Sequence, residues 1–173
     1  MTIGVIVQAR MGSNRLPGKI LKKVLDKPLL QFEIERLARC RAIDALTVAT
    51  SSGPLDDPVE ELLGRLDITC YRGSEEDVLD RYYQAAVLCR FEHIVRISGD
   101  CPLIDPGVVD RVVRFYLDHI DQFEYVNNIS PRTFPSGQEV EVFSFRSLAT
   151  AREYRYSRQN RMRRFRQQVT MKF

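Results

Sequence analysis

Short apolar runs alternate with segments of helical periodicity along the first 150 residues of the chain. The runs are rich in β-branched side chains and predict buried strands over residues 3–8, 45–50, 68–71, 93–97, 124–127 and 140–143. Apolar positions three and four residues apart predict helices over residues 29–40, 58–66, 76–90 and from 105 or 106 to about 119. This alternation predicts an α/β fold with a mostly parallel sheet and helices on both faces.

The most unusual polar residues follow directly after predicted strands. They occupy residues 10–19, 50–52, 72–74 and 99–100. In sheets of this kind, ligands bind beyond the carboxyl ends of the strands. The four segments therefore predict one shared ligand site at that edge of the sheet.

The composition is typical of one globular domain in a reducing compartment. The chain has 173 residues, of which 44% are hydrophobic and 28% are charged. No apolar run is long enough to span a membrane and no basic leader precedes the first strand, so we expect a cytoplasmic protein. No Cys-x-x-Cys pair or zinc-ligand spacing occurs, which favours reduced thiols at Cys40, Cys70, Cys89 and Cys101.

Charge divides the chain into two parts. The net charge is +3, yet residues 151–173 carry seven arginines, Lys172 and only Glu153, so this segment alone has a charge of +7. Subtracting +7 from +3 leaves −4 for the other 150 residues. We therefore expect a folded domain over residues 1–150 and a basic, arginine-rich tail over residues 151–173.

A basic, glycine-containing loop follows the first predicted strand. Residues 10–19 include Arg10, Arg15 and Lys19 together with two glycines. Forked guanidinium donors, a lysine and closely approaching backbone N–H groups suit the binding of anionic oxygens. A Walker A loop is excluded, because five residues separate the glycines and Ile20 follows the lysine. The alternative is a basic loop that is merely solvated.

Two aspartates follow the predicted strand at residues 93–97. Asp100 lies on a glycine-containing turn, where it can meet a metal ion or a hydroxyl group, and helix capping is the alternative. Asp105 is expected mainly to cap the helix that follows it. The two imidazoles, His93 and His119, are expected to be structural.

Two glutamates alternate with apolar residues near the last predicted strand. The alternation is expected to place Glu139 and Glu141 on one face of that strand. Carboxylates gathered in this way suit Mg²⁺, which prefers hard oxygen ligands from carboxylates and substrate phosphates. A solvent-facing strand edge is the alternative.

The junction at residues 72–81 is explained mostly by helix capping. Ser74 is expected to be an N-cap residue, with Asp77 three positions later in an arrangement resembling a capping box. Arg72 is not explained by this arrangement and is a candidate ligand contact.

Four segments occur in a distinctive order along the chain. They are residues 7–13 (VQARMGS), 15–19 (RLPGK), 72–82 (RGSEEDVLDRY) and 99–106 (GDCPLIDP). Together they closely resemble the spore coat polysaccharide biosynthesis protein F family. That family is similar to the acylneuraminate and 3-deoxy-manno-octulosonate cytidylyltransferases. The resemblance runs from residue 3 to about residue 150.

The resemblance implies a Rossmann-like nucleotide-diphospho-sugar transferase fold. It also implies transfer of a nucleotidyl group from CTP to an acidic sugar with Mg²⁺, for cell-surface or spore-coat polysaccharides, by a homodimer. The implied nucleotide-binding residues are Ala9, Arg10, Gly12, Ser13, Arg15, Lys19, Thr50, Ser51 and Arg72. The implied catalytic residues are Arg10, Lys19 and Asp100, and the implied metal ligands are Asp100, Glu139 and Glu141.

Two features depart from the family pattern. The family reads Pro-Asp-Gly-Leu-Asp-Val-Glu where this chain has Ser136 in place of an acid and Glu139 in place of an aspartate. After residue 150, the Arg-Glu-His-Val-Thr segment of the family is replaced by the basic tail. The tail predicts a truncated or frameshifted end, with a genuine basic tail as the alternative.

Two other functions are compatible with the sequence. A non-catalytic remnant would bind nucleotide through the phosphate loop without turnover on any sugar. A nucleic-acid binder would use Tyr154, Tyr156 and Phe165, which interleave with arginines in the tail. The second alternative ranks lower, because the tail explains nothing about the other 150 residues.

Overall fold

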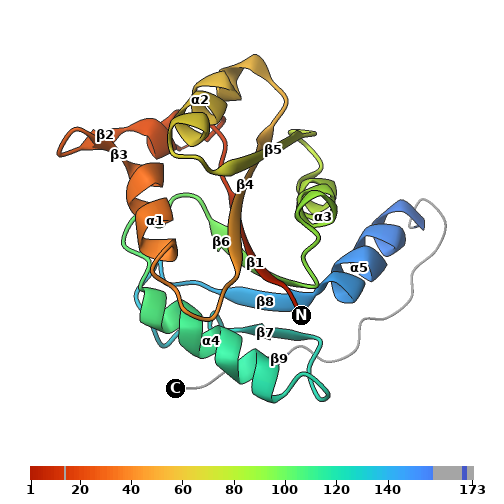
Figure 1. Cartoon of the computed structure of the whole chain (residues 1–173). Coiled ribbons are helices and arrows are strands. Elements are labelled where there is room, and N and C mark those ends of the chain that lie inside the picture. The colour runs from red at the N-terminus through yellow and green to blue at the C-terminus, as the bar shows by residue number, and fades with distance from the viewer. Residues whose placement is uncertain (14, 158–168, 171–173) are drawn as a thin grey trace.

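The apolar runs of the sequence form the centre of a seven-stranded sheet. The computed structural model describes residues 1–13, 15–157 and 169–170. The strand order is β5-β4-β1-β6-β8-β7-β9, and within the described sheet only β8 runs antiparallel to its neighbours (Figure 1). The strands are β1 (Ile3–Gln8), β4 (Ala45–Ser51), β5 (Thr69–Gly73), β6 (His93–Ser98), β7 (Tyr125–Asn127), β8 (Glu141–Ser144) and β9 (Val169–Thr170).

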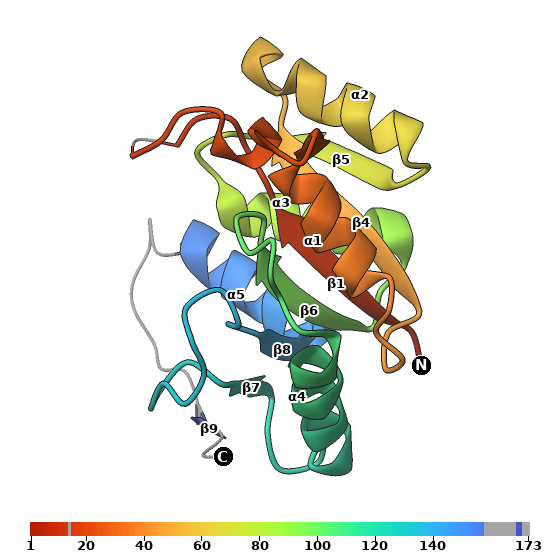
Figure 2. The same ribbon diagram turned by 90° about the vertical axis from the view of Figure 1, so that its left-hand side faces the viewer.

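Helices cover both faces of this sheet. One face packs against α1 (Leu29–Leu37), α2 (Asp57–Arg65) and α4 (Pro106–Asp118), and the other against α3 (Val78–Cys89) and α5 (Phe145–Ser157) (Figures 1 and 2). Two short 3-10 helices, η1 (Lys19–Leu21) and η2 (Pro54–Asp56), follow β1 and β4. A two-stranded hairpin of β2 (Lys23–Val24) and β3 (Lys27–Pro28) lies between η1 and α1.

The central strand is buried on both faces, as its continuous apolar run predicts. Val5 and Val7 belong to the core beneath α1, α2 and α4, whereas Ile6 belongs to the core beneath α3 and α5. All three side chains are fully buried. β1 pairs with β4 on one side and with β6 on the other, so its carboxyl end lies in the middle of the sheet edge.

The predicted strands and helices are all present, with shifted ends. The start of α3 corrects one prediction, because the helix begins at Val78 and its N-cap is Asp77, whose side chain accepts from Asp80 N at 3.0 Å. Ser74 Oγ instead accepts from Asp77 N at 3.2 Å, within the turn that precedes the helix. The prediction that Ser74 is the N-cap in a capping box is therefore wrong. The prediction that Asp105 caps α4 is confirmed.

The pattern of apolar positions does not predict α5, which continues across residue 150. Leu148 is its one buried residue, so the helix shows little apolar periodicity. Polar contacts attach it to α3: Arg152 Nε lies 2.7 Å from Asp80 Oδ1, and Arg155 Nη1 lies 3.1 Å from Asp77 Oδ1. The predicted tail thus begins inside a helix, and most of its remainder, with the proposed nucleic-acid contact at Phe165, lies outside the described residues.

No helix in the described part of the chain combines the length and the apolar character that crossing a membrane requires.

Candidate functional site

The loop after β1 folds around the backbone of one residue, Met11. Its carbonyl oxygen accepts hydrogen bonds from Ser13 N at 2.8 Å and Gly18 N at 2.9 Å. Gly18 has a φ of 69°, a left-handed conformation that glycine adopts without a Cβ penalty, and it leads directly into η1. The loop therefore doubles back beside the end of β1, and it carries its three basic side chains with it.

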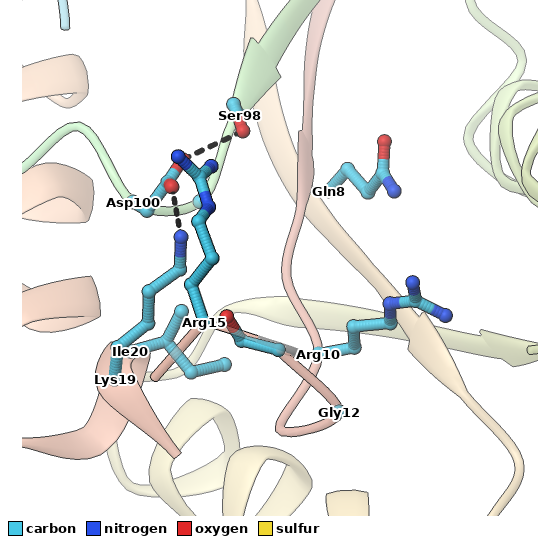
Figure 3. A pocket seen from close by; sticks show the side chains of 10 residues that line it. Gln8, Arg10, Gly12, Arg15, Lys19, Ile20, Ser98 and Asp100 are labelled. Carbon is cyan, nitrogen blue, oxygen red and sulfur yellow. Dashed lines mark hydrogen bonds and ion pairs between the residues drawn. The ribbon is translucent and has the colours of Figure 1, made fainter. Parts of the chain in front are cut away.

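A pocket of about 340 Å³ lies between this loop and the turn after β6 (Figure 3). Both segments follow the carboxyl ends of neighbouring central strands, where the sequence predicted a ligand site. The lining residues are Gln8, Arg10, Gly12, Ser13, Arg15, Lys19, Ile20, Ser98, Gly99 and Asp100. The structure thus brings together six of the predicted nucleotide or catalytic positions, namely Arg10, Gly12, Ser13, Arg15, Lys19 and Asp100.

Asp100 and Lys19 form an ion pair across the pocket (Figure 3). The Asp100 carboxylate also accepts a hydrogen bond from Ser98 Oγ at 2.7 Å. Partial burial raises the pKa of Asp100, but the hydrogen bonds from Lys19 and Ser98 and the charge of Lys19 outweigh it and hold the pKa below its usual range. The pocket therefore contains an ionised carboxylate beside a cation.

The two pocket arginines have different surroundings. Arg10 Nη1 lies 3.4 Å from the Glu75 carboxylate and 3.4 Å from the Glu75 carbonyl oxygen, on the side of the loop away from Lys19 (Figure 3). Arg15 is exposed on the rim of the pocket. Two of the three loop cations thus have carboxylate partners that an incoming anion would have to replace.

The floor of the pocket is closed by the approach of β6 to β1. Gly99 N donates to Gln8 O at 2.8 Å, at the point where both strands end. A Cβ atom at Gly99 would lie 2.7 Å from Gln8 O and 2.8 Å from Ala9 Cβ. Only glycine fits this close approach, which fixes the position of Asp100 relative to the phosphate loop.

Four predicted nucleotide-binding residues do not line the pocket. Ala9, Thr50 and Ser51 are buried in the sheet or at its edge. Arg72 is bound within the chain: its guanidinium donates to Asp57 Oδ1 at 2.6 Å, to Glu60 Oε2 at 2.7 Å and to two backbone carbonyl groups at the end of β4. In this structure Arg72 joins β5 to α2 and does not point into the site.

The two predicted glutamates do not share a strand face. β8 begins at Glu141, so Glu139 lies before the strand and the alternation argument fails for it. Glu141 pairs with Arg96 and accepts from Tyr125 Oη at 2.8 Å. Glu139 Oε1 instead lies 3.0 Å from Arg132 Nη2. Each carboxylate therefore has a separate cationic partner.

The histidines and cysteines have structural surroundings. His93 Nδ1 lies 3.0 Å from Tyr116 Oη, and His119 Nδ1 lies 2.8 Å from Phe115 O. Cys101 follows Asp100 directly, but burial raises the pKa of its thiol to about 12, so it is not a ready nucleophile. The described residues contain no cluster of three or more histidine, cysteine or acidic side chains that would hold a metal ion alone.

Several site residues were missed by the sequence analysis. Gln8 and Ser98 line the pocket as the last residues of β1 and β6, and Ile20 forms part of its wall. Their position at the carboxyl ends of strands was the available signal. Glu75 was assigned only to a capping segment, and its contact with Arg10 joins residues 65 positions apart.

Comparison with known proteins gives the family context of this pocket. The chain matches a protein-family model described as cytidylyltransferase over residues 4–171. An uncharacterized protein of Methanocaldococcus jannaschii is 39% identical over 151 residues, which are 87% of this chain and 60% of that protein. The spore coat polysaccharide biosynthesis protein SpsF of Bacillus subtilis is 35% identical over 71% of this chain and 53% of its own length.

An 8-amino-3,8-dideoxy-manno-octulosonate cytidylyltransferase of Shewanella amazonensis is 31% identical over 72% of this chain and 51% of its own length. The chain thus spans about half to three fifths of the length of these curated relatives.

Solved structures of cytidylyltransferases are also similar to this chain. A cytidylyltransferase from Leptospira borgpetersenii serovar Hardjo-bovis is 36% identical and superposes with a TM-score of 0.85, covering 92% of this chain and 68% of that one. The CMP:2-keto-3-deoxy-manno-octonic acid synthetase complexed with CTP has a TM-score of 0.74 at 18% identity, covering 89% of this chain and 78% of its own. The second likeness concerns the fold alone, and it agrees with the predicted nucleotidyltransferase architecture.

Proposed function

The chain belongs to the cytidylyltransferase family, and we propose that it transfers a cytidylyl group from CTP to an acidic sugar and releases pyrophosphate. The observation that carries this proposal is the pocket at the carboxyl ends of β1 and β6. It places Arg10, Arg15 and Lys19 on one loop, opposite Asp100. A concentration of cations on a glycine-containing loop suits a triphosphate.

The proposed chemistry is one in-line displacement at the α-phosphorus of CTP. A bond forms between a sugar hydroxyl oxygen and the α-phosphorus, and the bond from that phosphorus to the bridging oxygen breaks. The hydroxyl proton passes to solvent and pyrophosphate leaves. Such transfers depend mainly on positioning and on neutralising charge, so they do not require a covalent intermediate on the protein.

The loop residues supply that positioning and charge. All three basic side chains line the pocket. In the proposed reaction Arg15 and Lys19 neutralise the departing pyrophosphate, and Arg10 serves the same anion from the other side of the loop. Arg10 and Lys19 are paired with Glu75 and Asp100 in the free protein, so the triphosphate exchanges with those carboxylates. The exchange frees Asp100 once nucleotide is bound.

The donor set fits a divalent cation. Mg²⁺ commonly takes one or two carboxylates together with substrate phosphates and waters, so a cluster of three protein ligands is unnecessary. Asp100 is the carboxylate that lines the pocket and would hold the ion, whereas Glu139 and Glu141 do not line it and remain predictions. When bound, Mg²⁺ would supply charge neutralisation at the phosphate oxygens.

The acceptor is proposed from the relatives. One is named as an octulosonate cytidylyltransferase, and another as a spore coat polysaccharide biosynthesis protein. Both names agree with an acidic sugar that is activated for a cell-surface polysaccharide. A homodimer also remains a proposal, based on the family resemblance.

The test is pyrophosphate release from CTP, UTP, ATP and GTP with Mg²⁺ and a panel of acidic sugars. We expect release that depends on CTP and on one sugar class. Lys19→Ala should lower the rate at least about 100-fold, as removal of one transition-state donor commonly does. Lys23→Ala, on the exposed hairpin outside the pocket, is the matched control and should keep the parental rate.

Thermal unfolding with nucleotide separates this proposal from a non-catalytic remnant. CTP at about 100 times its dissociation constant should stabilise the folded protein by about 2.7 kcal/mol. Stabilisation by CTP without pyrophosphate release from any sugar would favour the remnant. A Lys19→Ala variant that releases pyrophosphate at the parental rate would contradict the assignment of the loop.

A further inference from the structure

Asp56 is a buried carboxylate at the turn from β4 into α2, with 2% of its surface exposed. Its Oδ1 accepts a hydrogen bond from Met11 N at 2.7 Å. Its Oδ2 accepts from Ser51 N at 3.0 Å and from Ser51 Oγ. One carboxylate thus joins the phosphate loop after β1 to the end of the neighbouring strand β4.

Helix capping does not explain this residue. Asp56 stands at the N-cap position of α2, yet its side chain makes no capping hydrogen bond to that helix. Both of its oxygens face donors from outside α2. The carboxylate is therefore directed toward the loop and the strand end.

The loop residue that donates to Asp56 is Met11, around which the loop folds. Met11 O accepts from Ser13 N and Gly18 N, while Met11 N donates to Asp56. Holding the backbone of Met11 in place consequently helps to hold both turns that bring Ser13 and Lys19 to the pocket. Asp56 itself does not line the pocket.

We propose that Asp56 is the positioning residue of the phosphate loop and that it sets the geometry in which the loop receives the triphosphate. The inference rests on the proposed function for the identity of the ligand. A negative charge beneath a loop that binds an anion opposes binding electrostatically. Its presence there is explained by hydrogen-bond geometry, because donors approach both oxygens and only a carboxylate accepts at both.

This geometry makes Asp56→Asn the informative variant. The amide is nearly the same size, but it has one acceptor oxygen and an NH₂ group. Whichever way the amide turns, its NH₂ meets either Met11 N–H or Ser51 N–H. One buried donor then loses its acceptor. A loss of this kind typically increases the equilibrium constant for local opening by about tenfold.

Asp110 offers a matched control. It is 7% exposed, and its carboxylate also accepts from backbone N–H groups, Arg41 N at 2.8 Å and Ala42 N at 3.0 Å. These donors precede β4, at the amino end of that strand, away from the pocket. Both donors reach the same oxygen, Oδ1, so an amide oxygen at that position can keep them. Asp110→Asn therefore makes the same chemical change at a buried aspartate without touching the phosphate loop.

The experiment measures hydrogen–deuterium exchange in the nucleotide-free protein and CTP affinity by titration. In Asp56→Asn, we expect amides of residues 9–19 to exchange about tenfold faster and CTP to bind about tenfold more weakly, as expected for one orphaned donor. In Asp110→Asn, the exchange of the loop amides and the CTP affinity should stay at the parental values.

Unchanged loop exchange in Asp56→Asn, or equal loop effects in both variants, would overturn the inference. If Asp56→Asn does not fold, Ser51→Ala takes its place, since it removes one hydroxyl donor to Asp56. A smaller increase in loop exchange supports the proposal, and no increase contradicts it. Failure of the parental protein to bind CTP counts against the proposed function, whereas the exchange comparison still decides the role of Asp56.

Discussion

Glu33 is a fully buried acid in α1, beneath the turn that carries Asp100. Its Oε2 accepts from Cys101 N at 3.0 Å, while Oε1 has no partner in the described structure. Burial raises the pKa of Glu33 from 4.5 to about 8; the hydrogen bond from Cys101 N lowers the pKa, and the charge of Asp100 raises it. The side chain therefore supports this wall of the pocket in its neutral form at neutral pH.

This pKa predicts a pH-dependent stability. The folded-state pKa lies above that of the unfolded chain, so the neutral Glu33 contributes fully below pH 4.5, and the contribution is lost as the pH rises to about 8. Glu33→Gln should stabilise the protein more at pH 8 than at pH 5, by at least about 1 kcal/mol, since one pKa unit equals about 1.4 kcal/mol. Thermal unfolding at pH 5, 6.5 and 8 measures the difference.

Glu35→Gln on the same helix is the control for this prediction. Glu35 is hydrogen-bonded by Lys27 and Gln31, which lower its pKa, so it stays ionised in both states between pH 5 and 8. Its substitution should change the stability by a constant amount over this range. A constant effect of Glu33→Gln as well would contradict a raised pKa at Glu33.

Gly99 predicts a steric effect on the pocket. In Gly99→Ala, the new methyl group meets the Gln8 carbonyl and Ala9 Cβ within 2.8 Å, and neither can rotate away. The ends of β1 and β6 must separate, which should cost about 1–3 kcal/mol and weaken CTP binding. Gly64→Ala in α2, where no atom beyond the adjacent residues and the helix's own backbone lies within 4 Å of the new Cβ, should instead be neutral or stabilising. Thermal unfolding and CTP titration of both variants provide the test; parental CTP affinity in Gly99→Ala would refute it.

At the scale of residues, the sequence indicated the residues that line the pocket better than the residues that support it. Arg10, Lys19 and Asp100 were identified because basic and acidic residues after buried strands are chemically conspicuous. Arg72 has the same appearance, but its pairing with two acids of α2 depends on the tertiary packing of β5 against that helix. Asp56 was not singled out, because an aspartate just before a helix is a common capping residue.

At the scale of elements, the β2–β3 hairpin stores strain in its turn. Val24 pairs with Lys27, so Leu25 and Asp26 form a two-residue turn, and their φ angles are 50° and 63°. Turns with two positive φ values favour Asn-Gly or Asp-Gly, because a side chain in this conformation is unfavourable. Leu25 is also 89% exposed, so its apolar side chain gains little from burial.

Asp26→Gly is therefore expected to stabilise the protein by about 0.5–1 kcal/mol through relief of the positive φ angle. The midpoint of thermal unfolding should rise by about 1–4 °C for a chain of this size. Asp121→Gly is the control, because Asp121 is exposed in a turn without a positive φ angle. If Asp26→Gly lowers the unfolding midpoint below that of the parental protein as much as Asp121→Gly does, the turn is not strained.

Element prediction succeeded where an element has a continuous apolar run or an apolar stripe. β1, β4 and β6 have continuous apolar runs, and the amphipathic stripes of α2 and α4 gave ends within one or two residues. α5 was missed because Leu148 is its one buried residue, so its contacts with α3, which include two ion pairs, are not visible as apolar periodicity. The short β2–β3 hairpin was missed because its turn lacks glycine.

At the scale of the whole molecule, the α/β class and the mostly parallel sheet are confirmed. Alternation of strands and helices was sufficient for that prediction. The strand order was not predicted, because it depends on which crossover packs on which face. The antiparallel insertion of β8 between β6 and β7 brings Glu141 beside Arg96 in the sheet. The sequence had instead predicted that Glu141 shares a strand face with Glu139.

The central place of β1 also has a consequence in time. Ile3 pairs with His93, so 90 residues separate the first strand from its second neighbour along the chain. Ribosomes add about 5–20 residues per second, so β1 waits roughly 5–18 seconds during synthesis before β6 exists. Throughout that interval at least one edge of a largely apolar strand has no partner. The nascent chain is therefore most exposed to aggregation before β6 emerges, and the pocket cannot close until then.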